Sequence, residues 1–128
     1  MSFKNIEDLD VYNLSNALSD DIWTLVNKWD YFAKDTIGKQ LVRAADSISA
    51  NIAEGYGRYH YKENRNFCYY SRGSIFETKN WLQKARSRNL STVDVINPLL
   101  EKLDLIHRKL NGYMKFIGKS SPNEPLNK

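Results

Sequence analysis

The distribution of proline is the feature that most restricts how this 128-residue chain can fold. The three prolines are Pro98, Pro122 and Pro125, so residues 1–97 contain none. Helix interiors exclude proline because it lacks an amide hydrogen and clashes with the preceding turn, whereas β-rich domains usually carry more turn residues than this chain does. The long proline-free stretch therefore favours long helices.

Apolar residues recur at helical spacing in four successive segments, which predicts helices at about 7–29, 35–54, 60–88 and 92–117. The last segment is the most regular, because its apolar seam follows a heptad. The members of that seam are Val93, Ile96, Leu100, Leu103, His107, Leu110, Met114 and Ile117. A flanking row of Leu99, Ile106 and Tyr113 widens the predicted buried face.

The predicted breaks between these helices contain turn and capping residues. Asp35 is the expected N-cap of the second helix, and Gly55 and Gly57 allow the chain to turn after it. Ser91 with Asp94 resembles a capping box before the fourth helix.

Short connections between long helices favour an all-α, antiparallel up-down four-helix bundle. We expect this domain to span residues 1–118, followed by a polar, disordered tail over residues 119–128.

Few residues offer catalytic or metal-binding chemistry. The single cysteine, Cys68, excludes an internal disulfide, and His60 and His107 lie too far apart in sequence to suggest a metal site. His107 falls on the apolar seam, so we interpret it as a buried, hydrogen-bonded core residue, and Cys68 as a small packed hydrophobe. We therefore expect no enzymatic activity, no cofactor and no metal.

The chain also lacks the signals of a membrane protein. No apolar run approaches the roughly 18–20 residues that span a bilayer. The opening MSFKNIEDLD has no apolar core of a signal peptide, so we expect a cytoplasmic protein with no membrane partner.

A first polar constellation lies along the second predicted helix and faces the third. We expect a semi-buried network that fixes helix register, with Arg43 pairing with Glu77, and Ser47 or Asn51 with Ser74. Its members are Arg43, Ser47, Asn51, Glu54, Ser74 and Glu77.

Charge is unevenly distributed along the chain. Residues 1–54 hold 5 basic and 9 acidic side chains, whereas residues 55–128 hold 14 basic and 6 acidic ones. Such asymmetry is typical of a half that faces a polyanion, or of self-association between acidic and basic surfaces.

A second constellation, the basic stripe, concentrates this positive charge on the third predicted helix. Its core repeats every seven residues, which advances about 10.5 Å and drifts only ~20° around a helix. The stripe consists of Arg58, Lys62, Arg65, Arg72, Lys79, Arg86 and Arg88. Interleaved tyrosines that could stack on bases are Tyr59, Tyr61, Tyr69 and Tyr70. Three interpretations remain open: nucleic-acid contact, pairing with a neighbouring subunit's acidic half, or a solvated outer face.

The stretch QLVRAADSISANIAEGYGR at Gln40–Arg58 resembles the signature of a bacterial family. This is the family of four-helix-bundle proteins associated with intervening sequences inside 23S ribosomal RNA genes. GSIFE at Gly73–Glu77 and LDVY at Leu9–Tyr12 resemble its other motifs. The match departs at Trp29–Phe32, where the family often has Phe-Pro, and at Ser71-Arg72, where it often has an apolar residue and alanine.

The resemblance implies up-down bundles that assemble as rings, typically homopentamers. It also implies kinship with accessory proteins of diversity-generating retroelements, which bind a reverse transcriptase and nucleic acid through a basic surface. For most members no activity is established. Our hypothesis is a non-enzymatic, oligomeric RNA- or DNA-binding bundle. The alternatives are a protein-interaction scaffold, for example for a reverse transcriptase, and an enzyme with a pocket at Arg43 and Glu77.

Overall fold

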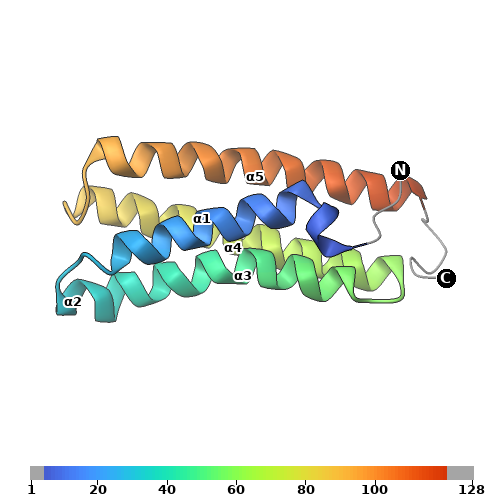
Figure 1. Cartoon of the computed structure of the whole chain (residues 1–128), viewed down its shortest axis with the longest axis horizontal. Coiled ribbons are helices and arrows are strands. Elements are labelled where there is room, and N and C mark those ends of the chain that lie inside the picture. Colours follow the sequence, from blue (N-terminus) through green and yellow to red (C-terminus); the bar gives the residue numbers. More distant parts are fainter. Residues whose placement is uncertain (1–4, 121–128) are drawn as a thin grey trace.

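The computed structural model describes residues 5–120, and this part of the chain is helical throughout, with no strand (Figure 1). The elements are the short helix η1 (Ile6–Asp8), α1 (Asp10–Val26), α2 (Tyr31–Ala33), the π-helical turn η2 (Lys34–Gly38), α3 (Lys39–Tyr56), α4 (Tyr61–Ser87) and α5 (Val93–Ser120). The four long helices lie side by side with successive directions reversed (Figure 1). The predicted all-α four-helix bundle is therefore confirmed.

The four long helices form a closed square in cross-section. The helix α1 packs against α3 and α5, and α4 packs against the same two helices from the opposite corner. The most extensive of these contacts joins α3 to α4. Gly55 permits the close approach, because a Cβ atom there would lie 2.6 Å from Oδ1 of Asn64 and 2.9 Å from Cβ of Phe67.

The buried face of α5 is rotated from the predicted seam. The residues that line the core are Ile96, Leu99, Leu103, Ile106, Leu110, Tyr113 and Ile117. Val93 is 52% exposed, and Leu100, His107 and Met114 are only half-buried. The predicted flanking row thus belongs to the core, because it faces the bundle interior between α1 and α4.

The expected role of His107 is consequently wrong. Its ring is half-buried at the edge of the α4–α5 contact, where it meets Phe76 edge-to-face at a centroid distance of 5.2 Å. No hydrogen bond of its side chain is formed within residues 5–120. A histidine at a heptad position lies at the rim here because the larger apolar side chains occupy the centre.

Both predicted helix caps are displaced. Asp30 caps α2, where its Oδ1 accepts a hydrogen bond of 2.9 Å from the Ala33 amide, whereas Asp35 lies within η2 and pairs with Lys39 at 3.2 Å. The helix α5 begins after Thr92, so Ser91 does not cap it directly. The Ser91 hydroxyl accepts a hydrogen bond from the Trp29 indole instead, at 3.1 Å. This bond joins the α1–α2 and α4–α5 connections at one end of the bundle.

The helix α5 continues through Ser120, two residues beyond the predicted end of the domain. The remainder of the predicted tail, residues 121–128, lies outside the described part of the chain. No helix among residues 5–120 combines the length and apolarity that crossing a bilayer requires.

Candidate nucleic-acid interface

The polar row of α3 does not form the expected network with α4. Within α3, the Ser47 hydroxyl donates to the Arg43 carbonyl at 2.8 Å, and the Asn51 amide donates to the Ser47 carbonyl at 2.9 Å. Arg43 itself is exposed. Serine and asparagine side chains commonly bond to the carbonyl one turn earlier when they lie at a helix surface.

The matching residues of α4 also bond within their own helix. The Ser74 hydroxyl donates to the Tyr70 carbonyl at 3.2 Å, and Glu77 accepts from the Trp81 indole at 3.3 Å. The predicted pairs of Arg43 with Glu77, and of Ser47 or Asn51 with Ser74, are therefore absent from the described residues. These side chains lie at the outer rim of the α3–α4 contact, where water is an available partner.

The polar link between α3 and α4 is made by a residue that was not among the members of the expected network. Ser71 is fully buried and donates a hydrogen bond of 2.8 Å to the Ile48 carbonyl. Ser74, three residues further on, is offset by about 60° around α4, so it lies at the rim while Ser71 faces the interior.

Asn64 lies at the centre of a second buried cluster of polar side chains, which the sequence interpretation missed. It is 1% exposed, and its amide donates to the Tyr113 hydroxyl at 3.1 Å while its carbonyl oxygen accepts from the Cys68 thiol at 3.8 Å. Burial raises the pKa of both Cys68 and Tyr113 to about 12. Asn64 precedes Cys68, which was expected to be packed, by one helical turn, and this shared face was the sequence signal that it occupies a core position.

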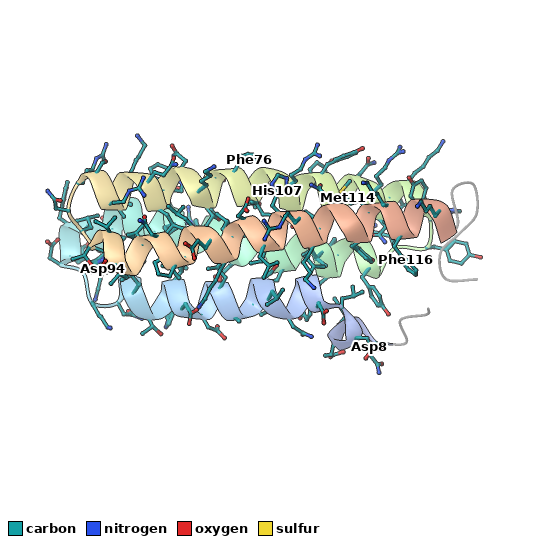
Figure 2. All side chains as sticks on the ribbon, turned by 90° about the horizontal axis from the view of Figure 1, so that it is seen from above. Asp8, Phe76, Asp94, His107, Met114 and Phe116 are labelled. Carbon is teal, nitrogen blue, oxygen red and sulfur yellow. The ribbon has the colours of Figure 1, made fainter. Side chains whose placement is uncertain are left out.

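The basic stripe follows the side of α4 that faces α5. Arg86 donates a hydrogen bond of 2.7 Å to Asn97 of α5, and Lys79 borders a hollow whose other wall includes Asp104 and His107 of α5. Figure 2 shows nitrogen-tipped side chains projecting from this edge of the bundle, with Phe76 at its outer margin. Lys62, Lys79 and Arg88 are exposed and the arginines between them are half-buried.

Aromatic rings hold three of the stripe's guanidinium groups. The Cζ atoms of Arg65 and Arg72 lie 5.3 and 5.0 Å from the ring centroids of Tyr61 and Tyr69. Arg58 lies 4.9 Å from the Phe67 centroid. Such cation–π contacts fix the position of a cation without neutralising its charge.

The two ends of the stripe differ in their ion pairs. Arg58 contacts Glu54 at 3.1 Å and Glu63 at 3.7 Å, so the N-terminal end is neutralised. The six stripe residues that follow Arg58 form no ion pair with any carboxylate of residues 5–120. From Lys62 onward the stripe therefore carries uncompensated positive charge.

The four tyrosines expected to interleave with the stripe have different surroundings. Tyr59, Tyr69 and Tyr70 are 50%, 43% and 59% exposed. Tyr61 is half-buried against the core, and its hydroxyl would lie 3.1 Å from a Cβ atom on Gly118. Its ring is thus a support for Arg65 and is not free to stack on a base.

Phe76 is an exposed ring that the sequence interpretation did not include in the stripe. It is 53% exposed and shares a small hollow of about 50 Å³ with Lys79, Asp104 and His107. It follows Tyr69 by seven residues, and that shared repeat with the cations was the available sequence signal.

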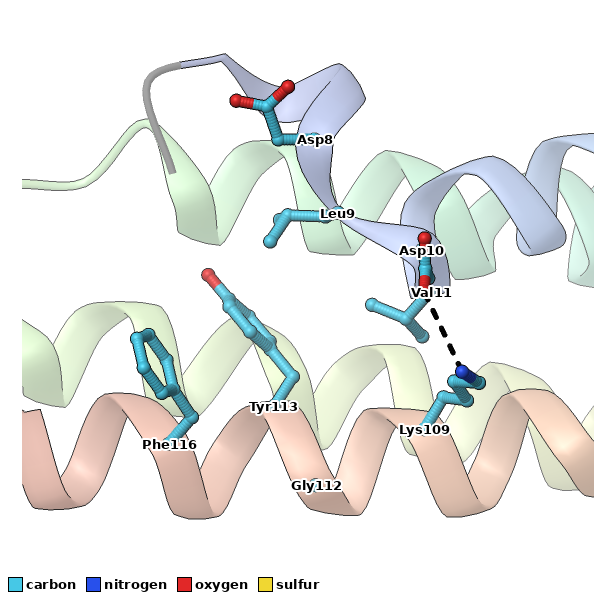
Figure 3. Close-up of a pocket in the computed structure, with 8 residues that line it drawn as sticks. All are labelled: Asp8, Leu9, Asp10, Val11, Lys109, Gly112, Tyr113 and Phe116. Atoms are coloured by element: carbon cyan, nitrogen blue, oxygen red, sulfur yellow. Dashed lines mark ion pairs between the residues drawn. The ribbon is translucent and has the colours of Figure 1, made fainter. Parts of the chain in front are cut away.

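A larger cleft of about 450 Å³ lies elsewhere, between the start of α1 and the end of α5 (Figure 3). Its apolar wall includes Leu9, Val11 and Phe116, and Asp10 pairs with Lys109 across it at 3.6 Å. Neither this cleft nor the small hollow is lined by Arg43 or Glu77. No three His, Cys, Asp or Glu side chains of the described residues are grouped so that they could hold a metal ion.

The fold and surface define a helical bundle with one cationic edge. Residues 7–112 match the sequence model of the 23S rRNA-intervening sequence protein family, and the chain belongs to this family. The predicted family resemblance is therefore confirmed.

A solved structure has a similar fold. It is the crystal structure of a protein with unknown function from the S23 ribosomal protein family of Bacteroides thetaiotaomicron. The TM-score is 0.74 at 21% identity, with 82% of this chain and 98% of that chain covered. At this identity the similarity concerns the fold alone. No curated protein matches the chain.

Proposed function

We propose that this protein is a non-enzymatic, oligomeric nucleic-acid-binding bundle, and that the basic stripe of α4 is its contact surface. The observation that carries the proposal is the absence of carboxylate partners along the stripe from Lys62 to Arg88, within the described residues. Cations left without internal anions can neutralise phosphates, and nucleic acid, whether RNA or DNA, supplies them in a regular array.

The tyrosine rings that hold the arginines of the stripe favour phosphate binding. Arg65 and Arg72 are held over tyrosine rings, so they lose less side-chain freedom when they engage a phosphate. Arginine also presents several donors in a fork that matches phosphate oxygens. Nothing along the stripe resembles a base-reading motif, so the proposed binding is independent of sequence and depends strongly on salt.

Self-association is part of the proposal. Large apolar side chains away from the stripe are exposed, among them Trp23 at 58%, Tyr31 at 79% and Phe32 at 78%. Exposed apolar patches are typical of protein–protein contacts. We propose a homo-oligomer, a ring-shaped pentamer by family resemblance, that acts in the cytoplasm and presents several stripes to one polyanion. The mass of the intact assembly tests this part.

The binding experiment compares two charge-reversal variants of equal net charge. Arg65→Glu with Arg72→Glu alters the stripe, whereas Lys28→Glu with Arg43→Glu alters exposed cations on other elements. We expect affinity for a structured RNA at low salt to fall by a factor on the order of 100 in the first variant, and far less in the second.

Equal losses in the two variants would show that only net charge matters and would refute the proposed surface. Absence of binding by the unaltered protein at low salt would refute nucleic-acid binding altogether. The protein-interaction scaffold, with a reverse transcriptase as one possible partner, would then be the better hypothesis.

A further inference from the structure

Two exposed rings accompany the cations on the same side of α4. Tyr69 is 43% exposed although the Arg72 guanidinium lies 5.0 Å from its ring centroid, and Phe76 is 53% exposed next to Lys79. Each ring therefore has a cation of the stripe beside it and a large part of its surface open to solvent. The surface combines two kinds of contact, one for phosphate and one for a flat apolar partner.

The spacing of the rings matches that of the cations. Seven residues separate Tyr69 from Phe76, and seven separate Arg72 from Lys79, which corresponds to about 10.5 Å along the helix axis. A nucleic-acid strand advances roughly 3.4 Å per nucleotide when its bases are stacked. Rings and cations at this interval thus meet about every third nucleotide of one strand.

A duplex can contact the cations of this surface but not its aromatic rings. Its phosphates are accessible to the cations, but its bases are paired and stacked on one another, so their flat faces are not available to a side chain. In an unpaired strand the bases can turn outward and stack on aromatic rings, and every base offers such a face.

We infer that the stripe takes unpaired nucleic-acid strands in preference to duplex, with Tyr69 and Phe76 as the stacking platforms. This inference rests on the proposed function, since the cations must first attract the strand. Arg65, Arg72 and Lys79 then contact the phosphates and set the salt dependence. The two rings add a contribution that salt does not weaken in the same way, because stacking releases no counterions.

The test uses Tyr69→Leu with Phe76→Leu, which keeps apolar side chains but removes the flat rings. Tyr70→Leu is the matched control, since this ring is 59% exposed on the same helix but lies about 160° around α4 from Arg72. The probes are an oligothymidine strand of about 16 nucleotides, within the range of known single-strand sites, a strand of the same length without bases, and a DNA duplex of that length.

For the unaltered protein we expect tighter binding to oligothymidine than to the duplex or the baseless strand. The Tyr69/Phe76 variant should bind oligothymidine weaker by roughly tenfold for each ring. Its duplex affinity should fall far less, through the lost Tyr69 support of Arg72, and its salt slope should stay unchanged. The Tyr70→Leu control should bind all three probes like the unaltered protein.

Equal losses on all three probes, no loss on any, or a changed mass of the assembly in the Tyr69/Phe76 variant would overturn the inference. The last result would mean that the rings belong to a subunit contact. These outcomes differ from failure of the proposed function itself, in which the unaltered protein binds no probe or the Arg65/Arg72 reversal has no effect.

Discussion

The helices α3 and α4 each carry a row of polar side chains along their length, yet the two rows satisfy their polar groups in different ways. On α3, Ser47 and Asn51 bond to carbonyls of their own helix, and Glu54 pairs with Arg58. On α4, Arg65 and Arg72 rest on tyrosine rings and form no ion pair within the described residues.

This difference separates a surface whose polar groups are largely paired within the chain from one whose charges are open to an external anion. In the row of α3, local bonds already use the Ser47 hydroxyl, the Asn51 amide and the Glu54 carboxylate. The row of α4 gathers like charges whose mutual repulsion is relieved only by salt or by an external anion. Spacing alone does not distinguish the two rows, since both follow the helical repeat.

The largest expected effect concerns the point where the two helices approach most closely. Gly55→Ala should lower the free energy of unfolding by about 3 kcal/mol, because the new Cβ would displace Asn64 and Phe67. Gly57→Ala is the matched control, since its nearest neighbours would lie at 3.6 and 3.7 Å, and it should change stability by less than about 0.5 kcal/mol. Urea unfolding at constant protein concentration measures both. Similar values for the two variants would contradict the close α3–α4 packing.

The buried side of α4 should make the protein sensitive to alkali. The pKa of Cys68 is raised by burial from 9.0 to about 12, so between these values the unfolded chain releases a proton that the folded chain keeps. The contribution of the buried Cys68 thiol to the free energy of unfolding is therefore fully present below pH 9, and it declines as the pH rises toward 12. Between pH 8.5 and 10.5 the unaltered protein should lose about 2 kcal/mol more than Cys68→Ala. An equal loss in both proteins would show that Cys68 is not buried.

A smaller effect distinguishes Ser71 from Ser74 on α4. Ser71→Ala removes the buried bond to the Ile48 carbonyl and should cost about 1 kcal/mol. Ser74→Ala removes only a bond within α4 at the rim and should cost less than about 0.5 kcal/mol. Thermal unfolding of both variants makes the comparison, and a larger cost at Ser74 would restore the cross-helix network predicted for that residue.

The smallest expected effect comes from a variant that extends the uncompensated part of the stripe. Glu54→Gln with Glu63→Gln removes two carboxylates that contact Arg58. The positive charge of Arg58 is then less compensated, so duplex affinity at low salt should rise about two- to threefold and the salt slope by up to ~0.9. Unchanged binding would mean that Arg58 lies outside the contact surface.

Much of the fold could be predicted from the sequence because it depends on periodicity. The four helices follow from apolar spacing and the missing prolines, and their ends are close to those observed. The errors concern rotation and partners. His107 lies on a regular heptad but at the rim, since only packing decides which of two adjacent apolar rows is central. Asp30 and not Asp35 caps α2, because the π-helical turn moves the start of the helix.

The candidate site was predictable in part, for a similar reason. A repeat of seven places the stripe on one side of α4, but it does not show that Arg58 is neutralised while Arg65 is not. That distinction depends on Glu54, which reaches Arg58 from the end of α3. Tyr61 and Tyr69 each support an arginine, and only the structure shows that Tyr69 also keeps much of its ring open to solvent while Tyr61 does not.

The central claim is that the stripe is open in the assembled protein and meets a polyanion there. Cysteine labelling tests it directly, because the single native thiol, Cys68, is fully buried and should contribute little background. The variant Lys79→Cys should react with a maleimide as fast as Lys28→Cys in the free assembly, and structured RNA should protect position 79 alone. Slow labelling at position 79 without RNA would place the stripe between subunits, and rapid labelling in the presence of RNA would show that no nucleic acid covers it.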